Sequence, residues 1–186
     1  MTPQPYDPYA SHLPAMCFIL GRLGRAIRSI LEVGSGFYST PFFHAFASSV
    51  LKTEHVILES DETWRENVAN LFDVEVLAFD VNELPDDIVQ RHWDLAFIDC
   101  LVESTRAQHA LALKDNADVI VLHDSNPDWN MAYEYSAIIP SWKHSHHFTE
   151  TYPHTLLLTD SDDIWHTLGL QNSLTSGAKH LARDSV

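Results

Sequence analysis

Residues 30–41 read ILEVGSGFYSTP, and this stretch decides the fold. The apolar run at its start predicts a strand over residues 29–33. The Gly-Ser-Gly that follows breaks the strand, because glycine adopts backbone conformations that other residues avoid. Thr40 then offers a helix N-cap and Pro41 a first helical position. The stretch therefore predicts a strand, a tight turn and a helix over residues 41–51.

The same alternation of strand and helix continues along the chain. It predicts strands at 55–59, 75–79, 93–98 and 117–122, a helix at 62–72 capped by Ser60, and a helix at 103–114. Residues 119–122 (Val-Ile-Val-Leu) are apolar on both alternating faces, which is typical of a central parallel strand. The pattern predicts a doubly wound α/β fold, with a mostly parallel sheet of about seven strands and helices on both faces.

The two ends of the chain complete this picture. Residues 1–28 form a lead-in with a helix at 13–27, and a helical segment opens at Asn126-Pro127 and is ended by Pro140. Strands at 147–149 and 155–158 are too close for a helical crossover, so they are predicted to be antiparallel. Residues 173–186 form a small polar tail without an assigned function. We expect a single domain over residues 1–186.

Composition limits the partners of this protein. The formal net charge is -15, from 11 basic and 26 acidic residues. A field of this sign repels phosphate backbones, so a nucleic-acid partner is not expected. No apolar run approaches the ~20 residues of a membrane-spanning helix, and no secretory signal is recognisable. With two separated cysteines, Cys17 and Cys100, a cytoplasmic location is expected.

Twelve histidines are present, and His144, His146 and His147 lie close together. On a strand, His144 and His146 share one face and form a candidate metal site. We favour an exposed strand instead, because no Cys, Asp or Glu completes a ligand set at metal spacing.

Five predicted strands end at or next to an acidic residue: Glu32, Glu59, Asp80, Asp99 and Asp124. In an open α/β sheet, ligands bind outside the carboxyl ends of the strands. Gly34 permits a tight turn there, and Gly36 lets the backbone approach a ligand closely. The sequence therefore predicts a nucleotide-type cofactor site at residues 32–36.

Residues 31–40 resemble the first motif of class I S-adenosylmethionine-dependent methyltransferases, in which an acid is followed by two glycines at alternate positions. The resemblance covers roughly residues 30–124 and favours the small-molecule, O-methyltransferase-like branch. It implies S-adenosylmethionine as the cofactor, with Glu59 accepting hydrogen bonds from the ribose hydroxyls and Asp80 near the adenine amino group. The cofactor-binding residues it implies are Glu32, Gly34, Ser35, Gly36, Phe37, Glu59, Asp80 and Asp99.

Catechol-type members of that family hold Mg²⁺ with an Asp after the fourth strand and an Asp-Asn pair after the fifth. Asp99 and Asp124 match the two carboxylates. Ser125, however, stands where the family has Asn, and Val102 stands where it has a lysine base. Hard cations need several oxygen ligands. We therefore expect no metal, and Asp99 and Asp124 are the candidate ligands if one binds.

The resemblance implies methyl transfer to a small hydroxyl- or amine-bearing substrate. Asp99, His123 and Asp124 are the predicted catalytic residues, because two carboxylates at neighbouring strand ends repel and pairing with His123 relieves this. Asp99 or His123 then serves as the general base. Arg106 either binds an acidic substrate or pairs with Glu103.

Two other functions remain open. One is a catalytically idle cofactor-binding or interaction domain, which suits the small size and the lack of an obvious substrate lid. The other is a nicotinamide-dependent oxidoreductase, against which Ser39 in place of a third glycine and Glu32 before the turn both argue. The sequence identifies neither the methyl acceptor nor the oligomeric state.

Overall fold

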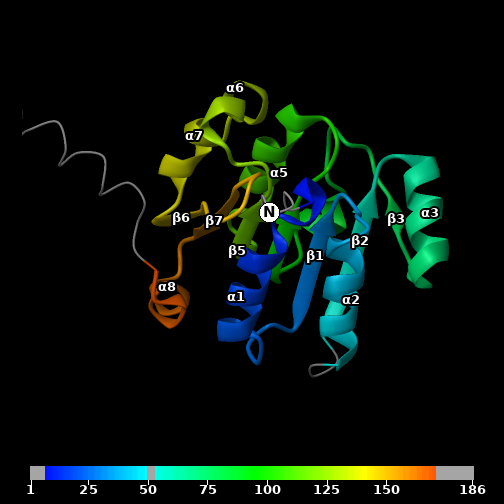
Figure 1. The fold of residues 1–186 in the computed structure, drawn as a ribbon, viewed down its shortest axis with the longest axis horizontal. Helices are drawn as coiled ribbons and strands as arrows, with labels where there is room; N and C mark the ends of the chain where they lie inside the picture. Colours follow the sequence, from blue (N-terminus) through cyan, green and yellow to red (C-terminus); the bar gives the residue numbers. More distant parts are fainter. Residues whose placement is uncertain (1–6, 50–52, 171–186) are drawn as a thin grey trace, which may run out of the picture.

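The computed structural model describes residues 7–49 and 53–170. A seven-stranded sheet with the order β3-β2-β1-β4-β5-β7-β6 runs through it (Figure 1). Its strands are β1 (Ser29–Val33), β2 (Glu54–Glu59), β3 (Leu77–Ala78), β4 (Trp93–Ile98), β5 (Ala117–Leu122), β6 (His144–Phe148) and β7 (Thr155–Thr159). Every neighbouring pair is parallel except the two that include β7. The predicted fold class, with its reversed strand near the end, is confirmed.

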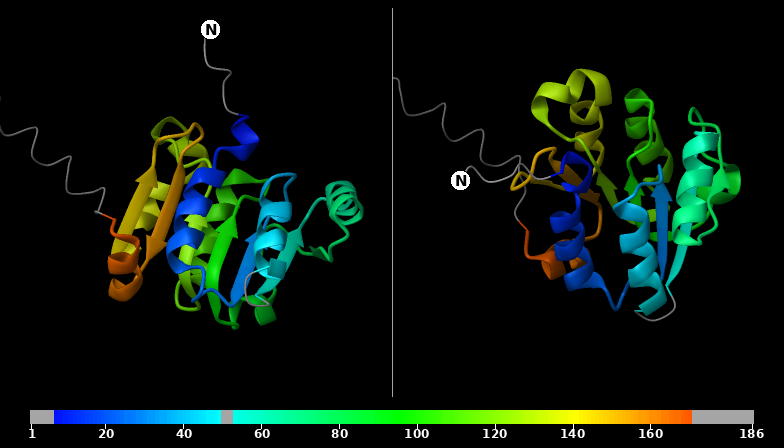
Figure 2. Two further views of the ribbon diagram at one scale, coloured as in Figure 1. Left: turned by 60° about the horizontal axis from the view of Figure 1, so that its bottom comes forward. Right: turned by 45° about the vertical axis from the view of Figure 1, so that its right-hand side comes forward.

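Helices cover both faces of the sheet (Figure 2). They are α1 (Leu13–Leu23), α2 (Ser39–Ser49), α3 (Glu62–Phe72), α4 (Asp86–Val89), α5 (Arg106–Leu113), α6 (Asn130–Tyr133), α7 (Tyr135–Ile138) and α8 (Asp162–Leu168). Leu95 and Phe97 of β4 pack with α1, α2 and α8, whereas Ala96 and Ile98 pack with α4, α5 and α7. Alternate residues of β4 therefore pack into two separate hydrophobic cores, one on each face of the sheet. This explains why residues on both faces of the strand are apolar.

Two predicted helix N-caps are wrong. α2 begins at Ser39 rather than Pro41, so Thr40 lies inside the helix instead of capping it. Asp61 caps α3 in place of Ser60, because its Oδ1 accepts a hydrogen bond from the Trp64 N–H at 2.7 Å. In both places two polar residues compete for the cap, and tertiary contacts decide between them.

Other boundaries also differ from prediction. α1 ends at Leu23, before Gly24, and β3 is an exposed edge strand of two residues rather than five. The segment opened by Pro127 is divided into short helical pieces, and β6 begins at His144 rather than three residues later. The strand pair is nevertheless antiparallel, as predicted.

Neither the four-residue helix α4 nor α8 was predicted, although α8 has clear signals at both ends. Ser161 caps it, since its Oγ accepts a hydrogen bond from the Ile164 N–H at 3.3 Å, and Gly169 ends it in a left-handed conformation. These are ordinary start and stop signals that the sequence did contain. The predicted tail at residues 173–186 lies outside the described residues. Across residues 7–49 and 53–170, no helix is long and apolar enough to cross a membrane.

Candidate functional site

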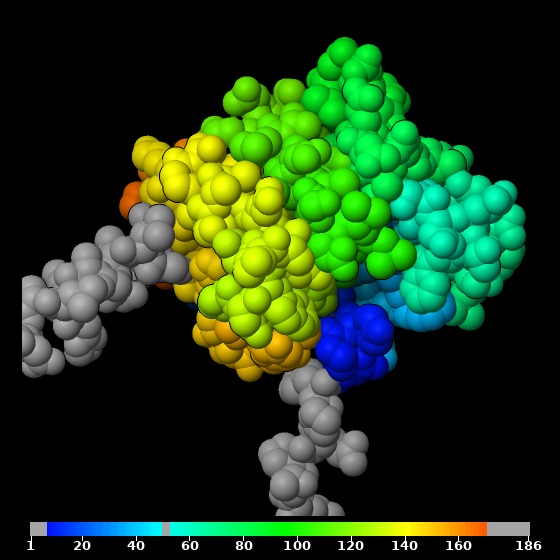
Figure 3. Space-filling view, turned by 90° about the horizontal axis from the view of Figure 1, so that it is seen from above, coloured from blue at the N-terminus to red at the C-terminus, as the bar shows by residue number. Residues whose placement is uncertain are grey.

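Strands β2, β1, β4 and β5 end side by side at the top of Figure 1, and we call this the carboxyl edge. Figure 3 looks down on it. The N-terminal segment before α1 (blue) lies there between the segment that follows β5 (yellow-green) and the region of α2 and α3 (cyan). The segment before α1 and the segment after β5, far apart in the sequence, therefore contribute to one site.

Gly34 forms the turn that leaves β1. Its φ is +92°, and its N–H donates to the Leu58 carbonyl oxygen at 2.9 Å. A Cβ at this position would lie 2.5 Å from both Cα and N of Cys100, in the loop after β4. Only glycine meets both demands, because the left-handed backbone and the close approach each exclude a side chain.

Glu32 lies beneath this turn rather than in front of it. Its side chain is fully buried, and its Oε1 accepts a hydrogen bond at 3.0 Å from Oγ1 of Thr40. The same Thr40 oxygen accepts the N–H of Gly36 at 3.0 Å. His55 Nε2 contacts the other Glu32 oxygen at 2.9 Å. Glu32 therefore contacts protein groups on both oxygens and fixes the turn from below.

Glu59 and Ser35, two of the predicted cofactor-binding residues, are in direct contact. Oε2 of Glu59 accepts the Ser35 N–H at 2.9 Å and the Ser35 Oγ–H at 3.0 Å, while Oε1 accepts the Asp61 N–H at 2.9 Å. A carboxylate offers about four lone-pair positions. One position, on Oε1, is therefore left for a further donor. Glu59 is only 3% exposed, so a ligand group that donates to this oxygen has to reach it from the edge of the glycine turn.

Two aromatic rings support the same turn. Trp64 Nε1 donates to the Ser35 carbonyl oxygen at 2.7 Å, and its ring centroid lies 4.4 Å from that of Phe37. Phe37 is 44% exposed and gives the turn an apolar face toward solvent.

Asp80 makes its described hydrogen bonds away from this turn, with the N–H and side-chain amide of Asn82 at 2.9 Å each. Those bonds lower the pKa of Asp80.

Arg106 bridges the two acids that end β4 and β5. Its Nη1 lies 2.9 Å from Oδ1 of Asp99 and 2.9 Å from Oδ2 of Asp124. Its Nε donates to the Cys100 carbonyl oxygen at 2.7 Å, and the residue is 5% exposed. The predicted pairing of Arg106 with Glu103 is wrong. The negative charges of Asp99 and Asp124 attract the guanidinium inward instead.

His123 completes this group of charges. Its Nδ1 lies 3.1 Å from Oδ2 of Asp99, the expected pair, and 3.5 Å from Oδ1 of Asp124. Burial opposes charge on His123, yet the Asp99 carboxylate raises the pKa of His123 above its ordinary value. Burial likewise disfavours the Asp99 anion, but His123 and Arg106 hold the pKa of Asp99 well below its usual range. The two carboxylates thus face Arg106 and a histidine whose charged form they favour, which makes their burial tolerable.

Two residues of the site were missed by the sequence analysis. Ser11 Oγ lies 2.7 Å from His123 Nε2, across 112 positions of sequence. The His12 ring lies 5.0 Å from the rings of both His123 and Phe97 and is 1% exposed. Burial, followed by the nearby His123, lowers the pKa of His12 to about 4. No local motif marks either residue, since both act through a long-range contact.

Comparison with known proteins finds matches among solved structures only. No protein-family model and no curated protein matches the sequence. The O-methyltransferase TomG from Streptomyces achromogenes, in complex with S-adenosylmethionine, is 18% identical with a TM-score of 0.55 over 78% of each chain. An O-methyltransferase from Bacillus cereus in complex with S-adenosylhomocysteine is 19% identical, with a TM-score of 0.53 over 78% of this chain and 79% of its own.

A third match is a methyltransferase from Podospora anserina bound to S-adenosylhomocysteine. It is 14% identical, with a TM-score of 0.59 over 82% of this chain and 80% of its own. The chain has the class I methyltransferase fold. At these identities the likeness establishes the fold alone, so the roles of individual residues in this methyltransferase fold depend on their own geometry.

That geometry does not fit a hard cation between the two acids. Arg106 already occupies the position between Asp99 and Asp124. Asn126, one place beyond the expected amide ligand, uses its Oδ1 to accept the His154 N–H at 2.9 Å. Ser125 Oγ lies 3.3 Å from His147 Nδ1. The oxygen ligands that Mg²⁺ needs are therefore not assembled around these carboxylates.

Proposed function

We propose that this protein transfers a methyl group from S-adenosylmethionine to a small acceptor that carries a hydroxyl or amine. The observation that carries the proposal is the contact between Glu59 and Ser35, which joins the end of β2 to the glycine turn of β1. It places a carboxylate with a free lone-pair position beside the glycine turn, on the same edge as Asp99. This combination suits a ligand with a diol and a charged amino-acid end.

The cofactor would lie along the turn from Gly34 to Phe37. The N–H groups of Gly34, Ser35 and Gly36 donate within the protein, so the end of the turn at Phe37 would meet its amino-acid portion. Glu59 Oε1 would accept a ribose hydroxyl, and the Phe37 ring would offer an apolar surface. The acidic surroundings favour a cationic sulfonium and disfavour a pyrophosphate, which supports this cofactor over a nicotinamide dinucleotide.

The cofactor supplies a methyl group on positively charged sulfur. The acceptor's oxygen or nitrogen bonds to the methyl carbon as the carbon–sulfur bond breaks, and the acceptor's proton passes to a base. We assign this base to Asp99, with His123 holding the carboxylate in place. Asp99 is a weak base, which suffices for a hydroxyl acceptor because its oxygen becomes strongly acidic as it is methylated, whereas a methylated amine can keep its proton until release. Asp124 and Arg106 position Asp99, and holding the reactants together supplies much of the acceleration.

Calorimetry with S-adenosylhomocysteine tests the cofactor site. Glu59→Ala should weaken binding about 10- to 150-fold, which corresponds to ~1.5–3 kcal/mol for hydrogen bonds to a charged acceptor. Glu62→Ala, an exposed acid at the start of α3, is the matched control and should bind like the unmutated protein. Unchanged affinity in Glu59→Ala would place the ribose elsewhere, and no binding by the unmutated protein would refute the proposal.

A specific observation keeps one alternative open. Ser11 and His12 cover His123, which is 4% exposed, so an acceptor would meet the Asp99 side chain, which is 23% exposed, and not His123 unless this segment moves. A catalytically idle binding domain would bind S-adenosylhomocysteine and methylate no member of a phenol and amine panel. A thermal-shift screen that also includes NAD and NADP separates the oxidoreductase, because a ligand at a hundredfold excess over Kd stabilises by ~2.7 kcal/mol.

A further inference from the structure

His12 is a buried polar side chain whose burial the proposed methyl transfer does not explain. It is 1% exposed, and among the described residues neither Nδ1 nor Nε2 has a hydrogen-bond partner. Leaving a buried polar group unpaired costs about 1–3 kcal/mol. A histidine placed this way at the edge of a site indicates that something else pairs with it.

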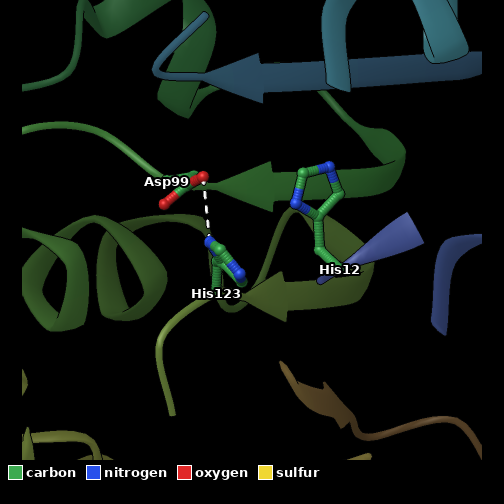
Figure 4. Close-up of side chains that lie close together, drawn as sticks. All are labelled: His12, Asp99 and His123. Carbon is green, nitrogen blue, oxygen red and sulfur yellow. Dashed lines mark hydrogen bonds and ion pairs between the residues drawn. The ribbon is translucent and has the colours of Figure 1, made fainter. Parts of the chain in front are cut away.

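Figure 4 shows what the His12 ring faces. It lies just ahead of α1 and points toward Asp99 at the end of β4 and His123 at the end of β5. Each of the three residues offers one ligand atom, and these atoms all lie within 4.8 Å of one another. Ligand atoms on one tetrahedral Zn²⁺ lie about 3.4 Å apart. Small side-chain rotations would bring the three onto a single ion.

The groups around these three side chains are those that support metal ligands. With Nδ1 of His123 on an ion, its Nε2 would stay bonded to Ser11 Oγ, which lies 2.7 Å away. With Oδ2 of Asp99 on the ion, its Oδ1 would stay paired with Arg106 at 2.9 Å. Such outer contacts fix the orientation of ligating histidines and carboxylates, and here they already exist.

We propose that His12, Asp99 and His123 form a binding site for a divalent transition-metal ion such as Zn²⁺. Two imidazoles and one carboxylate suit zinc or iron, whereas Mg²⁺ prefers oxygen ligands alone. The site differs from the oxygen site that the sequence resemblance implied, because it uses His12 and leaves Asp124 with Arg106. An ion there replaces the proton that His123 shares with Asp99.

Binding has a consequence that depends on the proposed function. The ion would occupy the carboxylate that we assign as base and would tie the segment at Ser11 and His12 to the carboxyl edge. Zn²⁺ should therefore inhibit methyl transfer. The binding site itself can be tested without cofactor, acceptor or activity.

The test is zinc binding by chelator-treated full-length protein, measured by competition with a chromophoric chelator. We expect one tight site, at least ~100-fold weaker in His12→Ala, and ~10-fold weaker in Ser11→Ala, where only an outer contact is lost. Co²⁺ should give visible absorption bands with the unmutated protein but not with His12→Ala. Mg²⁺ should not compete.

Two control variants address other histidine groups. His92, Asp94 and Asp118 also offer ligand atoms within 4.8 Å of one another, but on the surface, so His92→Ala should bind zinc normally. His146→Ala tests the histidines of β6 and should also bind zinc normally. If His12→Ala fails to fold by circular dichroism, Asp99→Asn and Ser11→Ala decide instead. Absence of a tight zinc site in the unmutated protein would overturn the proposal. Zinc affinities in the His12, Asp99 and Ser11 variants equal to that of the unmutated protein would also overturn it.

Discussion

Replacing Arg106 with methionine should destabilise this protein by about 3–5 kcal/mol, the cost of removing one partner from a buried ion pair. Methionine keeps most of the side-chain volume but removes the charge. The guanidinium is 5% exposed and holds Asp99 and Asp124 at 2.9 Å each. Its loss leaves the two carboxylates with His123 alone and frees the Cys100 carbonyl oxygen, to which Arg106 Nε donates at 2.7 Å.

Urea unfolding at neutral pH measures this change, and Arg91→Met is the control. Arg91 pairs with Glu54 at the surface, where the two side chains are 38% and 52% exposed, and its guanidinium lies 4.3 Å from the Trp93 ring centroid. Exposed ion pairs contribute about 0–1 kcal/mol and exposed cation–π contacts ~0.5–1 kcal/mol, so this control should lose less than about 2 kcal/mol. A loss in Arg106→Met no larger than in Arg91→Met would refute the reasoning.

Two further predictions concern the same edge. Gly34→Ala should cost at least ~3 kcal/mol, because the left-handed backbone costs ~1–2 kcal/mol and the new Cβ would meet Cys100 backbone at 2.5 Å. Gly169→Ala, at φ +68° with nothing within 4 Å, should cost only the strain; equal losses by urea unfolding would contradict the packing argument. On the proposed function, Asp99→Asn should lower methyl transfer at least ~10²-fold, while the unmutated protein should keep the activity in EDTA. Activity lost to EDTA and restored by Mg²⁺ would make Asp99 a ligand for that ion.

The middle of the fold was predictable because burial on both faces leaves a strong pattern. β1, β4 and β5 have the predicted bounds, and each is a short, mostly apolar run directly followed by a glycine or a polar residue. α3 also has its predicted bounds, 62–72. The glycine turn was predictable for the same kind of reason, since the backbone at Gly34 accepts one residue type.

The centre of the site was only half predictable. The rule that ligands meet the carboxyl ends of strands brought Asp99, His123 and Asp124 together correctly. It gave no information on Arg106, for which sequence spacing indicated Glu103, three residues earlier. The partners of Arg106 are set by the need to neutralise buried acids, a property of the folded edge and not of any local pattern.

β7 has a consequence for the order in which the sheet assembles. It lies between β5 and β6, and β6 pairs only with β7 among the described strands. β6 therefore joins the sheet only through a strand that is made after it. Because six residues separate the two strands, pairing within this hairpin closes a short loop, whereas docking on β5 closes a much longer one. We expect the hairpin to attach and detach as one cooperative unit, with the backbone amides of β6 and β7 sharing one free energy of opening in hydrogen exchange.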